Sequence, residues 1–230
     1  MNTDAFEHMK ANRDKALMLA QREIVSLVHN AVELEGIHFT LPEIQTLLDG
    51  ITVGGHKLTD QKIAVNQGNA WRHLFAALKN NSFALSASWV CDLHAIAAEE
   101  EALEWGKFRS GGVTIAGADY TPPPANQLNA LFNDLVASTN AIANIYDRAI
   151  HMFLTMARCQ FFYDVNKRMG RFMMNGILLD AGYPAINLPA KRQLEFNQLM
   201  LAFYTSGDES AMNHFLRSCL DERIIQIMSE

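Results

Sequence analysis

Apolar residues recur at spacings of three and four along most of the chain, which is the period of one face of an α-helix. Leu17, Ala20 and Ile24 follow this spacing, and Gly36 can adopt the left-handed conformation that ends a helix. Thr40 and Glu43 form a capping-box pattern before the next apolar stretch. We therefore predict a mainly α fold with helices over residues 4–35 (one or two helices), 40–49, 59–79, 85–101, 125–162 (with a break), 167–180, 189–205 and 208–230.

One segment interrupts the helical pattern. Residues 106–124 hold four of the 13 glycines and three of the six prolines of the chain. Within them Val113 and Ile115 alternate with Thr114, a spacing typical of a strand with one face covered. Glycine and proline on both sides indicate turns. The pattern predicts a short β-hairpin or flap here.

The composition excludes several classes of protein. The chain has 19 basic and 25 acidic residues, so its net charge of −6 argues against a nucleic-acid binder. The cysteines Cys91, Cys159 and Cys219 are too few for a disulfide framework and are typical of a reducing, cytoplasmic setting. No apolar run approaches the roughly 20 residues of a membrane span. The charged N-terminus also lacks the apolar stretch of a signal peptide.

Polar and basic side chains gather before the predicted helix 167–180, in the sequence QFFYDVNKRMGR of residues 160–171. Asn166 is the expected N-cap. Lys167, Arg168 and Arg171 place three cations in the first turn, where they oppose the helix dipole unless an anion lies among them. Free backbone N–H groups at a helix start also favour phosphate. Asp164 offers a hard oxygen ligand for Mg²⁺. A solvated basic turn is the alternative.

This stretch resembles the signature of the Fic/Doc (Fido) family, H-x-F-x-[DE]-G-N-[GK]-R-x-x-R, at Phe162, Asp164, Asn166, Lys167, Arg168 and Arg171. Members of that family transfer AMP, or another phosphate-containing group, from a nucleotide to a protein hydroxyl. The resemblance implies a Fic-fold helical bundle. It also implies that residues 106–124 form a flap, on which Val113, Thr114 and Ile115 dock the target segment as an added strand.

The resemblance further implies the role of each motif residue toward ATP and Mg²⁺. Asp164 would hold the metal, and Asn166 with the backbone of residues 165–168 would cradle the α-phosphate. Arg168 would bind the β- and γ-phosphates, and Arg171 the γ-phosphate. Lys167 also occurs in branches of the family that use other donors, so it does not fix the nucleotide.

Residues 30–36 (NAVELEG) resemble the inhibitory helix of autoinhibited members, which have the pattern [ST]-x-x-x-E-[GN]. The resemblance implies that Glu35 pairs with Arg171 and keeps the γ-phosphate from its productive position. Ala31 stands where that pattern has Ser or Thr, which removes one supporting hydrogen bond. A surface carboxylate is the other interpretation of Glu35. We divide the chain into an N-terminal helical extension, 1–50, and a Fic domain, 51–230.

Two departures concern the motif itself. Gln160 stands where the family has its general-base histidine, and an amide has no usable pKa for that role. We do not expect a neighbour to replace it, because His151 lies about 13 Å away along a helix. We expect His94 to be structural and Cys159 to point elsewhere. Val165 replaces a glycine, so the loop must keep a negative φ or distort the anion site.

Two functions follow from these residues. The first is an ATP- and Mg²⁺-dependent protein adenylyltransferase (AMPylation) whose activity is impaired by Gln160. The second is a catalytically dead Fic-fold module that binds or regulates a partner, or an inactivated variant of an active enzyme. In the first case the partner is a target protein with a Ser, Thr or Tyr hydroxyl, or the chain itself. The amphipathic C-terminal stretch also leaves a homodimer open.

Overall fold

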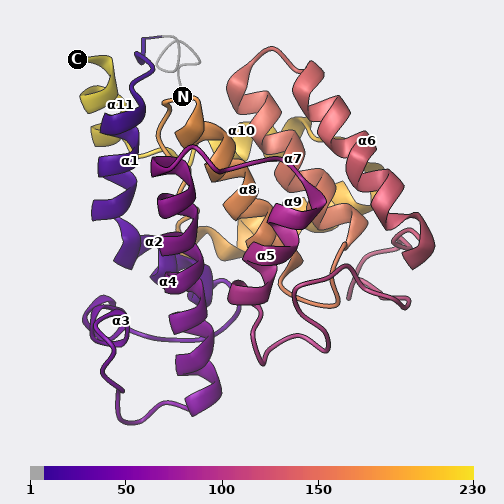
Figure 1. Cartoon of the computed structure of the whole chain (residues 1–230), viewed down its shortest axis with the longest axis horizontal. Coiled ribbons are helices and arrows are strands. Elements are labelled where there is room, and N and C mark those ends of the chain that lie inside the picture. The colour runs from indigo at the N-terminus through magenta and orange to yellow at the C-terminus, as the bar shows by residue number, and fades with distance from the viewer. Residues whose placement is uncertain (1–7) are drawn as a thin grey trace.

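The computed structural model describes residues 8–230 and is built from helices (Figure 1). The first five are α1 (Arg13–Arg22), α2 (Ile24–Glu33), α3 (Leu41–Leu48), α4 (Leu58–Lys79) and α5 (Ala87–Ala97). A long irregular segment leads to η2 (Ala125–Gln127), α6 (Leu128–Ala141), α7 (Ile145–Cys159) and α8 (Asn166–Asp180). The last are η3 (Ala190–Arg192), α9 (Gln193–Ser206), α10 (Ser210–Arg217) and α11 (Glu222–Ser229). The predicted mainly α fold is confirmed.

Several predicted helix boundaries differ from the structure. The 4–35 stretch contains two helices, one of the two predicted possibilities, but the first begins only at Arg13; residues 4–7 lie outside the described residues. The 85–101 helix begins at Ala87 and ends at Ala97, because the following residues turn and Glu100 has a φ of 60°. The 208–230 helix is two helices, since Asp221 caps a new start through the backbone N–H of Arg223.

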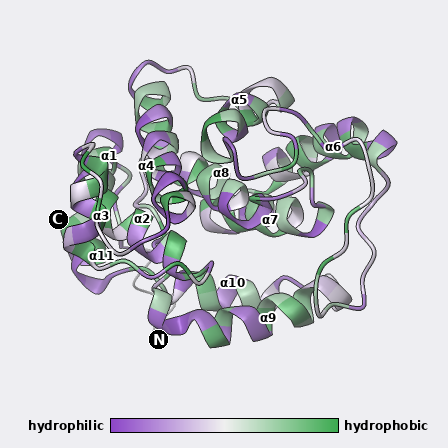
Figure 2. Ribbon diagram, turned by 90° about the horizontal axis from the view of Figure 1, so that it is seen from below, coloured by the Kyte–Doolittle hydropathy of each residue, from purple (hydrophilic) through white to green (hydrophobic). Residues whose placement is uncertain are grey.

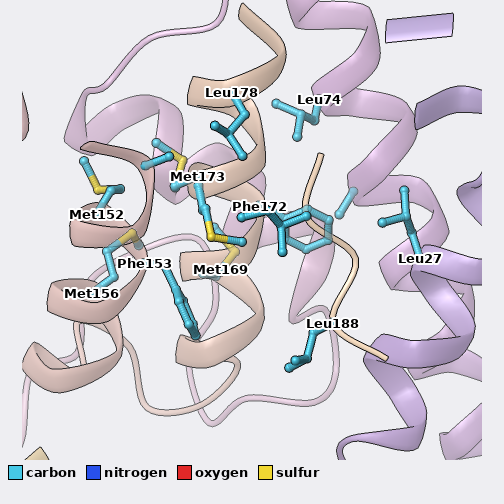
Figure 3. Packing of buried hydrophobic residues seen from close by; sticks show 14 of the residues in the cluster. Leu27, Leu74, Met152, Phe153, Met156, Met169, Phe172, Met173, Leu178 and Leu188 are labelled. Atoms are coloured by element: carbon cyan, nitrogen blue, oxygen red, sulfur yellow. The ribbon is translucent and has the colours of Figure 1, made fainter. Parts of the chain in front are cut away.

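Helices α7 and α8 lie side by side at the centre of the molecule (Figure 1). Gly170 allows this approach, because a Cβ there would lie 2.7 Å from the Phe153 ring and 2.9 Å from its carbonyl oxygen. Met152, Phe153 and Met156 of α7 face Met169 and Met173 of α8 (Figure 3). The packed apolar residues of α7 and α8 therefore support residues 160–165, which connect the two helices.

The N-terminal and C-terminal helices close the opposite side of the core. Helix α2 packs against α3 and α4, while α1 contacts α8 and α11. The backbone N–H of Lys10 bonds to the Met228 carbonyl at 2.9 Å, which ties the two ends together. Phe215, Leu216 and Met228 are buried, so the amphipathic C-terminal stretch completes the core. Figure 2 shows that hydrophobic and hydrophilic residues alternate along the helices.

The predicted β-hairpin over residues 106–124 is wrong for this structure, since no strand occurs within residues 8–230. The segment is irregular, and the backbone groups of Val113 and Thr114 make no hydrogen bond to any part of the described chain. Pro122 to Pro124 have no N–H groups to donate to a ladder. A hairpin needs paired backbone groups, and these residues offer few. None of the helices in residues 8–230 is long and apolar enough to cross a bilayer.

Candidate functional site

The connection between α7 and α8 brings the motif residues together. Gln160 ends α7 in a left-handed conformation (φ 50°), and Val165 precedes α8 in another (φ 63°). Asn166 is the first residue of α8 and not its N-cap, which is Val165, so the predicted N-cap is wrong. The side chain of Asn166 instead folds back onto the loop. It accepts from the Phe162 N–H at 2.9 Å and donates to the Phe162 carbonyl at 2.8 Å.

Val165 has a positive φ, so the negative φ that the sequence favoured for a valine here is wrong. Its side chain is buried, and its φ of 63° lies where β-branched residues are genuine outliers. Such strain costs about 1–3 kcal/mol and persists only where the surroundings impose it. The two hydrogen bonds of Asn166 to the backbone of the buried Phe162 close the loop around Val165 and supply such a constraint. The loop therefore keeps a glycine-like backbone without glycine.

Gln160 offers no proton acceptor in the position of a general base. Its Nε2 donates to the Ala157 carbonyl at 2.6 Å, and its Oε1 accepts from Asn166 Nδ2 at 3.0 Å. Both polar ends of the amide are therefore engaged within the loop. No titratable group of the amide can take a proton from a hydroxyl.

The neighbouring candidates for a base have other partners. His94 is fully buried and stacks on Phe162 at 3.7 Å between ring centroids. Its Nδ1 accepts from the Gly106 N–H at 3.1 Å, so its Nε2 carries the proton toward the Asp164 carbonyl at 3.3 Å. Burial lowers its pKa to about 4. His151 contacts Glu209 and Ser138, and burial raises the pKa of the Cys159 thiol to about 11.

Three cations of α8 surround the carboxylate of Glu35. Lys167 Nζ lies 3.8 Å from Glu35 Oε2, while Arg168 Nε and Arg171 Nη2 each lie 3.8 Å from Oε1. Burial alone would raise the pKa of Glu35, but Arg168, Lys167 and Arg171 outweigh it and lower that pKa. Glu35 is therefore an anion among cations contributed by one helix turn.

Two of the nitrogens near Glu35 are buried donors without a hydrogen-bond partner in the described chain, Arg168 Nε and Arg171 Nη2. Burial lowers the pKa of Arg171 to about 10, with Glu35 compensating only in part. An unsatisfied buried donor costs about 1–3 kcal/mol, and more when it is charged. A better-placed anion would remove this cost. The geometry thus fits a phosphate oxygen as well as the Glu35 carboxylate.

Glu101 is the site residue that the sequence did not indicate. It follows α5 and binds both terminal nitrogens of Arg168, with Nη1 donating to Oε2 at 2.9 Å and Nη2 to Oε1. Both side chains are largely buried. Burial alone would lower the pKa of Arg168, but the Glu101 hydrogen bonds and the Glu35 charge outweigh it and raise that pKa. In the sequence, Glu101 ends an acidic run that has the appearance of a solvated helix end.

Asp164 lies exposed at the rim of the same loop. Its Oδ1 accepts from the Val165 N–H at 2.6 Å. No group of three or more metal-ligating residues occurs within residues 8–230. A lone carboxylate suits Mg²⁺, which keeps several waters and shares its remaining positions with phosphates. The backbone N–H groups of Asn166, Lys167 and Arg168 also have no partner in the described chain.

The irregular segment 106–124 is fixed to the motif loop by Arg109. This buried guanidinium donates to the carbonyls of Gln160 (2.6 Å), Gly111 (2.6 Å) and Pro123 (2.5 Å). Its backbone N–H bonds to the Phe161 carbonyl at 3.0 Å. Val113 and Ile115 are half-buried and Thr114 is exposed between them. The segment therefore presents the backbone of Val113 and Thr114 beside the motif without hydrogen bonds to the described chain.

The turn that carries Glu35 is held by residues 187–193, which lie far from it in the sequence. Glu35 lies in the turn after α2, where Gly36 takes a φ of 78° as the sequence predicts. Gln193 of α9 donates to the carbonyls of Glu33 (3.3 Å) and Leu34 (3.1 Å). Asn30 of α2 bonds to Asn187 and to the Ala190 N–H, both at 3.0 Å. These contacts position the turn that carries Glu35.

Three cations lie at the start of the central helix α8, where backbone N–H groups also favour an anion. Residues 84–178, which include this helix, match the model of the Fic/DOC family. This part of the chain is therefore similar to the Fic/DOC family domain. The chain is 22% identical over 237 residues to a protein adenylyltransferase Fic of Aedes aegypti, covering 95% of this chain and 46% of the relative. The chain thus spans less than half the length of the curated relatives it matches.

Solved structures share the fold. A fragment of Fic-1 from C. elegans, residues 134–508, superimposes with a TM-score of 0.77 at 19% identity, covering 99% of this chain and 67% of that one. The structure of IbpAFic2 covalently tethered to Cdc42 gives a TM-score of 0.56 at 15% identity, with 94% and 67% covered. The Fic-fold helical bundle is therefore shown.

Proposed function

We propose that this chain binds ATP with Mg²⁺ and is a protein adenylyltransferase whose transfer step is impaired. The observation that carries the proposal is the convergence of Lys167, Arg168 and Arg171 on the Glu35 carboxylate, with two buried donors left unpartnered. Charge neutralisation and positioning supply most of the catalysis of phosphate transfer. These residues match that need, and curated relatives carry the name protein adenylyltransferase.

Each motif residue has a part in this proposal. Arg168 binds the β- and γ-phosphates, and Arg171 binds the γ-phosphate. The backbone of residues 165–168 cradles the α-phosphate at the start of α8, where the N–H groups of Asn166, Lys167 and Arg168 are without a partner in the described chain. Asp164 would hold Mg²⁺, which when bound would neutralise charge on the phosphates. Glu35 occupies the same cationic site without nucleotide and thereby opposes binding of the γ-phosphate.

The target hydroxyl approaches along the flap. The backbone of Val113 and Thr114 is free of hydrogen bonds in the described chain, and alternate side chains face inward. An extended target segment gains backbone hydrogen bonds by lying beside it as an added strand. The complex of IbpAFic2 with Cdc42 supports a protein as the target class. The chain itself is a second target to be tested.

Restoring the base tests this proposal. We expect Gln160→His to raise transfer of AMP by about 10²–10⁴-fold, and the double variant with Glu35→Gly to raise it further. The measurement is incorporation of label from ATP labelled at the α-phosphate into the chain and into proteins of a cell extract. The matched control, Gln160→Asn, gains no base and should stay at the level of the parent. A double variant that modifies nothing would refute the adenylyltransferase proposal.

A binding module is the second candidate, and Gln160 favours it. Both ends of its amide are engaged by Ala157 and Asn166, so the loop is well packed without a base. In this case the nucleotide pocket or the flap binds a partner without transfer. Saturable ATP binding by the parent with no labelling by the Gln160→His, Glu35→Gly variant would support this module.

A further inference from the structure

The guanidinium of Arg168 is shared between two carboxylates in unequal ways. Glu101 binds both terminal nitrogens in a bidentate pair, whereas Glu35 lies 3.8 Å from Nε without a hydrogen bond. The Arg168 side chain is only 3% exposed and that of Glu101 14% exposed. The bidentate geometry fixes the plane of the guanidinium, since two parallel bonds permit no rotation. Nε consequently stays close to Glu35 Oε1 but has no hydrogen-bond partner of its own.

The loop that carries Glu101 is itself held by α4. Asn66 donates to the Glu99 carbonyl at 2.8 Å, and Gln67 donates to the Ala97 carbonyl at 3.2 Å. Asn66 and Gln67 are both buried, which is unusual for amides and indicates a structural role. Glu100 takes a φ of 60°, so the chain accepts backbone strain immediately before Glu101. The loop therefore delivers this carboxylate to a fixed place.

We propose that Glu101 is a positioning residue that holds Arg168 by its terminal nitrogens and so presents Nε to the anion site. Arg168 Nε and Arg171 Nη2 lie at the same distance, 3.8 Å, from the single oxygen Glu35 Oε1. An anion oxygen that replaces Oε1 meets two donors that need no reorganisation. Without Glu101 the guanidinium would lose this orientation and ATP would bind more weakly. This rests on the proposed ATP site.

The test compares variants in a Glu35→Gly background, titrated calorimetrically with ATP and Mg²⁺. We expect Glu101→Gln and Glu101→Ala to weaken binding by about tenfold or more, because Arg168 is no longer fixed. Glu100→Gln is the matched control, since it removes the same charge from the adjacent exposed residue. It should change the Kd by less than about twofold. Tighter binding by Glu101→Gln would overturn the proposal, because Glu101 would then compete with phosphate.

A second measurement needs no nucleotide. The Nη–H resonances of Arg168, whose protons donate to Glu101, report in a ¹⁵N spectrum whether the guanidinium is fixed, and their loss in Arg168→Lys assigns them. We expect slow hydrogen exchange in the parent and at least tenfold faster exchange in Glu101→Gln. Unchanged exchange in a folded Glu101→Gln chain would refute the positioning role. If Glu35→Gly binds no ATP, the proposed function fails, and this spectrum still decides the role of Glu101.

Discussion

Nη2 of Arg171 lies 3.8 Å from Oε1 of Glu35, beyond hydrogen-bond distance although the arginine is buried. The pair gains Coulomb attraction but leaves a charged donor unsatisfied. Buried ion pairs compensate their desolvation only when the geometry and the remaining hydrogen bonds are good. Glu35 is therefore a partner that a phosphate oxygen can displace. In contrast, the closer pair of Arg168 with Glu101 meets these conditions.

The small cavity behind these arginines predicts the effect of a hydroxyl at position 31. It measures about 20 Å³, is lined by Ala31, Gln67, Arg168 and Arg171, and is large enough for one water. Residues that line this cavity carry buried polar atoms without a hydrogen-bond partner, including Gln67 Oε1, and a serine hydroxyl could bond to such an atom. We expect Ala31→Ser to stabilise the fold by about 1 kcal/mol in urea denaturation. Ala31→Cys, similar in shape but a weak hydrogen bonder, should not; equal gains from both would contradict this account.

The left-handed backbone at Val165 predicts an unusual order of stability. Ala at a positive φ remains strained, whereas Gly does not. Val165→Ala loses the buried side chain and keeps the strain, while Val165→Gly loses the side chain and relieves it. We expect the glycine variant to be more stable than the alanine variant by about 1 kcal/mol. Urea midpoints of the two variants measure the difference, and the usual preference for alanine would refute it.

His94 predicts a loss of stability in mild acid. The imidazole of His94 takes up a proton near pH 6.5 in the unfolded chain. In the folded chain its pKa is lowered to about 4, because burial disfavours the imidazolium. Stability from the neutral imidazole is therefore complete above pH 6.5 and declines as the pH falls toward 4, by up to about 3 kcal/mol. In His94→Gln this slope should be absent. The check is the free energy of unfolding at several pH values; parallel curves for parent and variant would contradict the prediction.

Arg109 predicts how the flap is anchored. Lysine cannot reproduce its fork of donors to the Gln160, Gly111 and Pro123 carbonyls. We expect Arg109→Lys to lower stability by roughly 2–3 kcal/mol and to expose residues 106–124 to chymotrypsin. Arg72→Lys is a control, since Arg72 donates to one backbone carbonyl, that of Leu48. Equal cleavage of the two variants would show that Arg109 does not anchor the segment.

Local patterns in the sequence predicted the parts of the fold that depend on neighbours along the chain. Thr40 and Glu43 do form the capping box, and Gly36 does take a positive φ. Asparagine is a residue type typical of an N-cap. The amide of Asn166 bonds to Phe162 instead, because the loop closes over it. The site also depends on contacts that local patterns do not contain. The pair of Glu101 with Arg168 spans 67 residues.

The flap, residues 106–124, also shows what local sequence patterns do not predict. Alternation of Val113, Thr114 and Ile115 is present in the structure as alternating exposure, yet the backbone has no partner strand in the described chain. Periodicity predicts which side chains face inward, but a strand also needs paired backbone groups. Buried charges are paired, so the burial of Arg168 indicates a carboxylate partner such as Glu101, but that burial is known only from the structure.

The central claim is that Glu35 occupies a phosphate site formed by the arginines of α8. Calorimetric titration with ATP and Mg²⁺ tests it in three chains: the parent, Glu35→Gly, and Glu35→Gly with Arg168→Ala. We predict weak binding by the parent, saturable binding at least about tenfold tighter by Glu35→Gly, and loss of binding in the double variant. Glu222→Gln, which removes a distant exposed carboxylate, should match the parent. Absence of ATP binding by a folded Glu35→Gly chain would contradict the account.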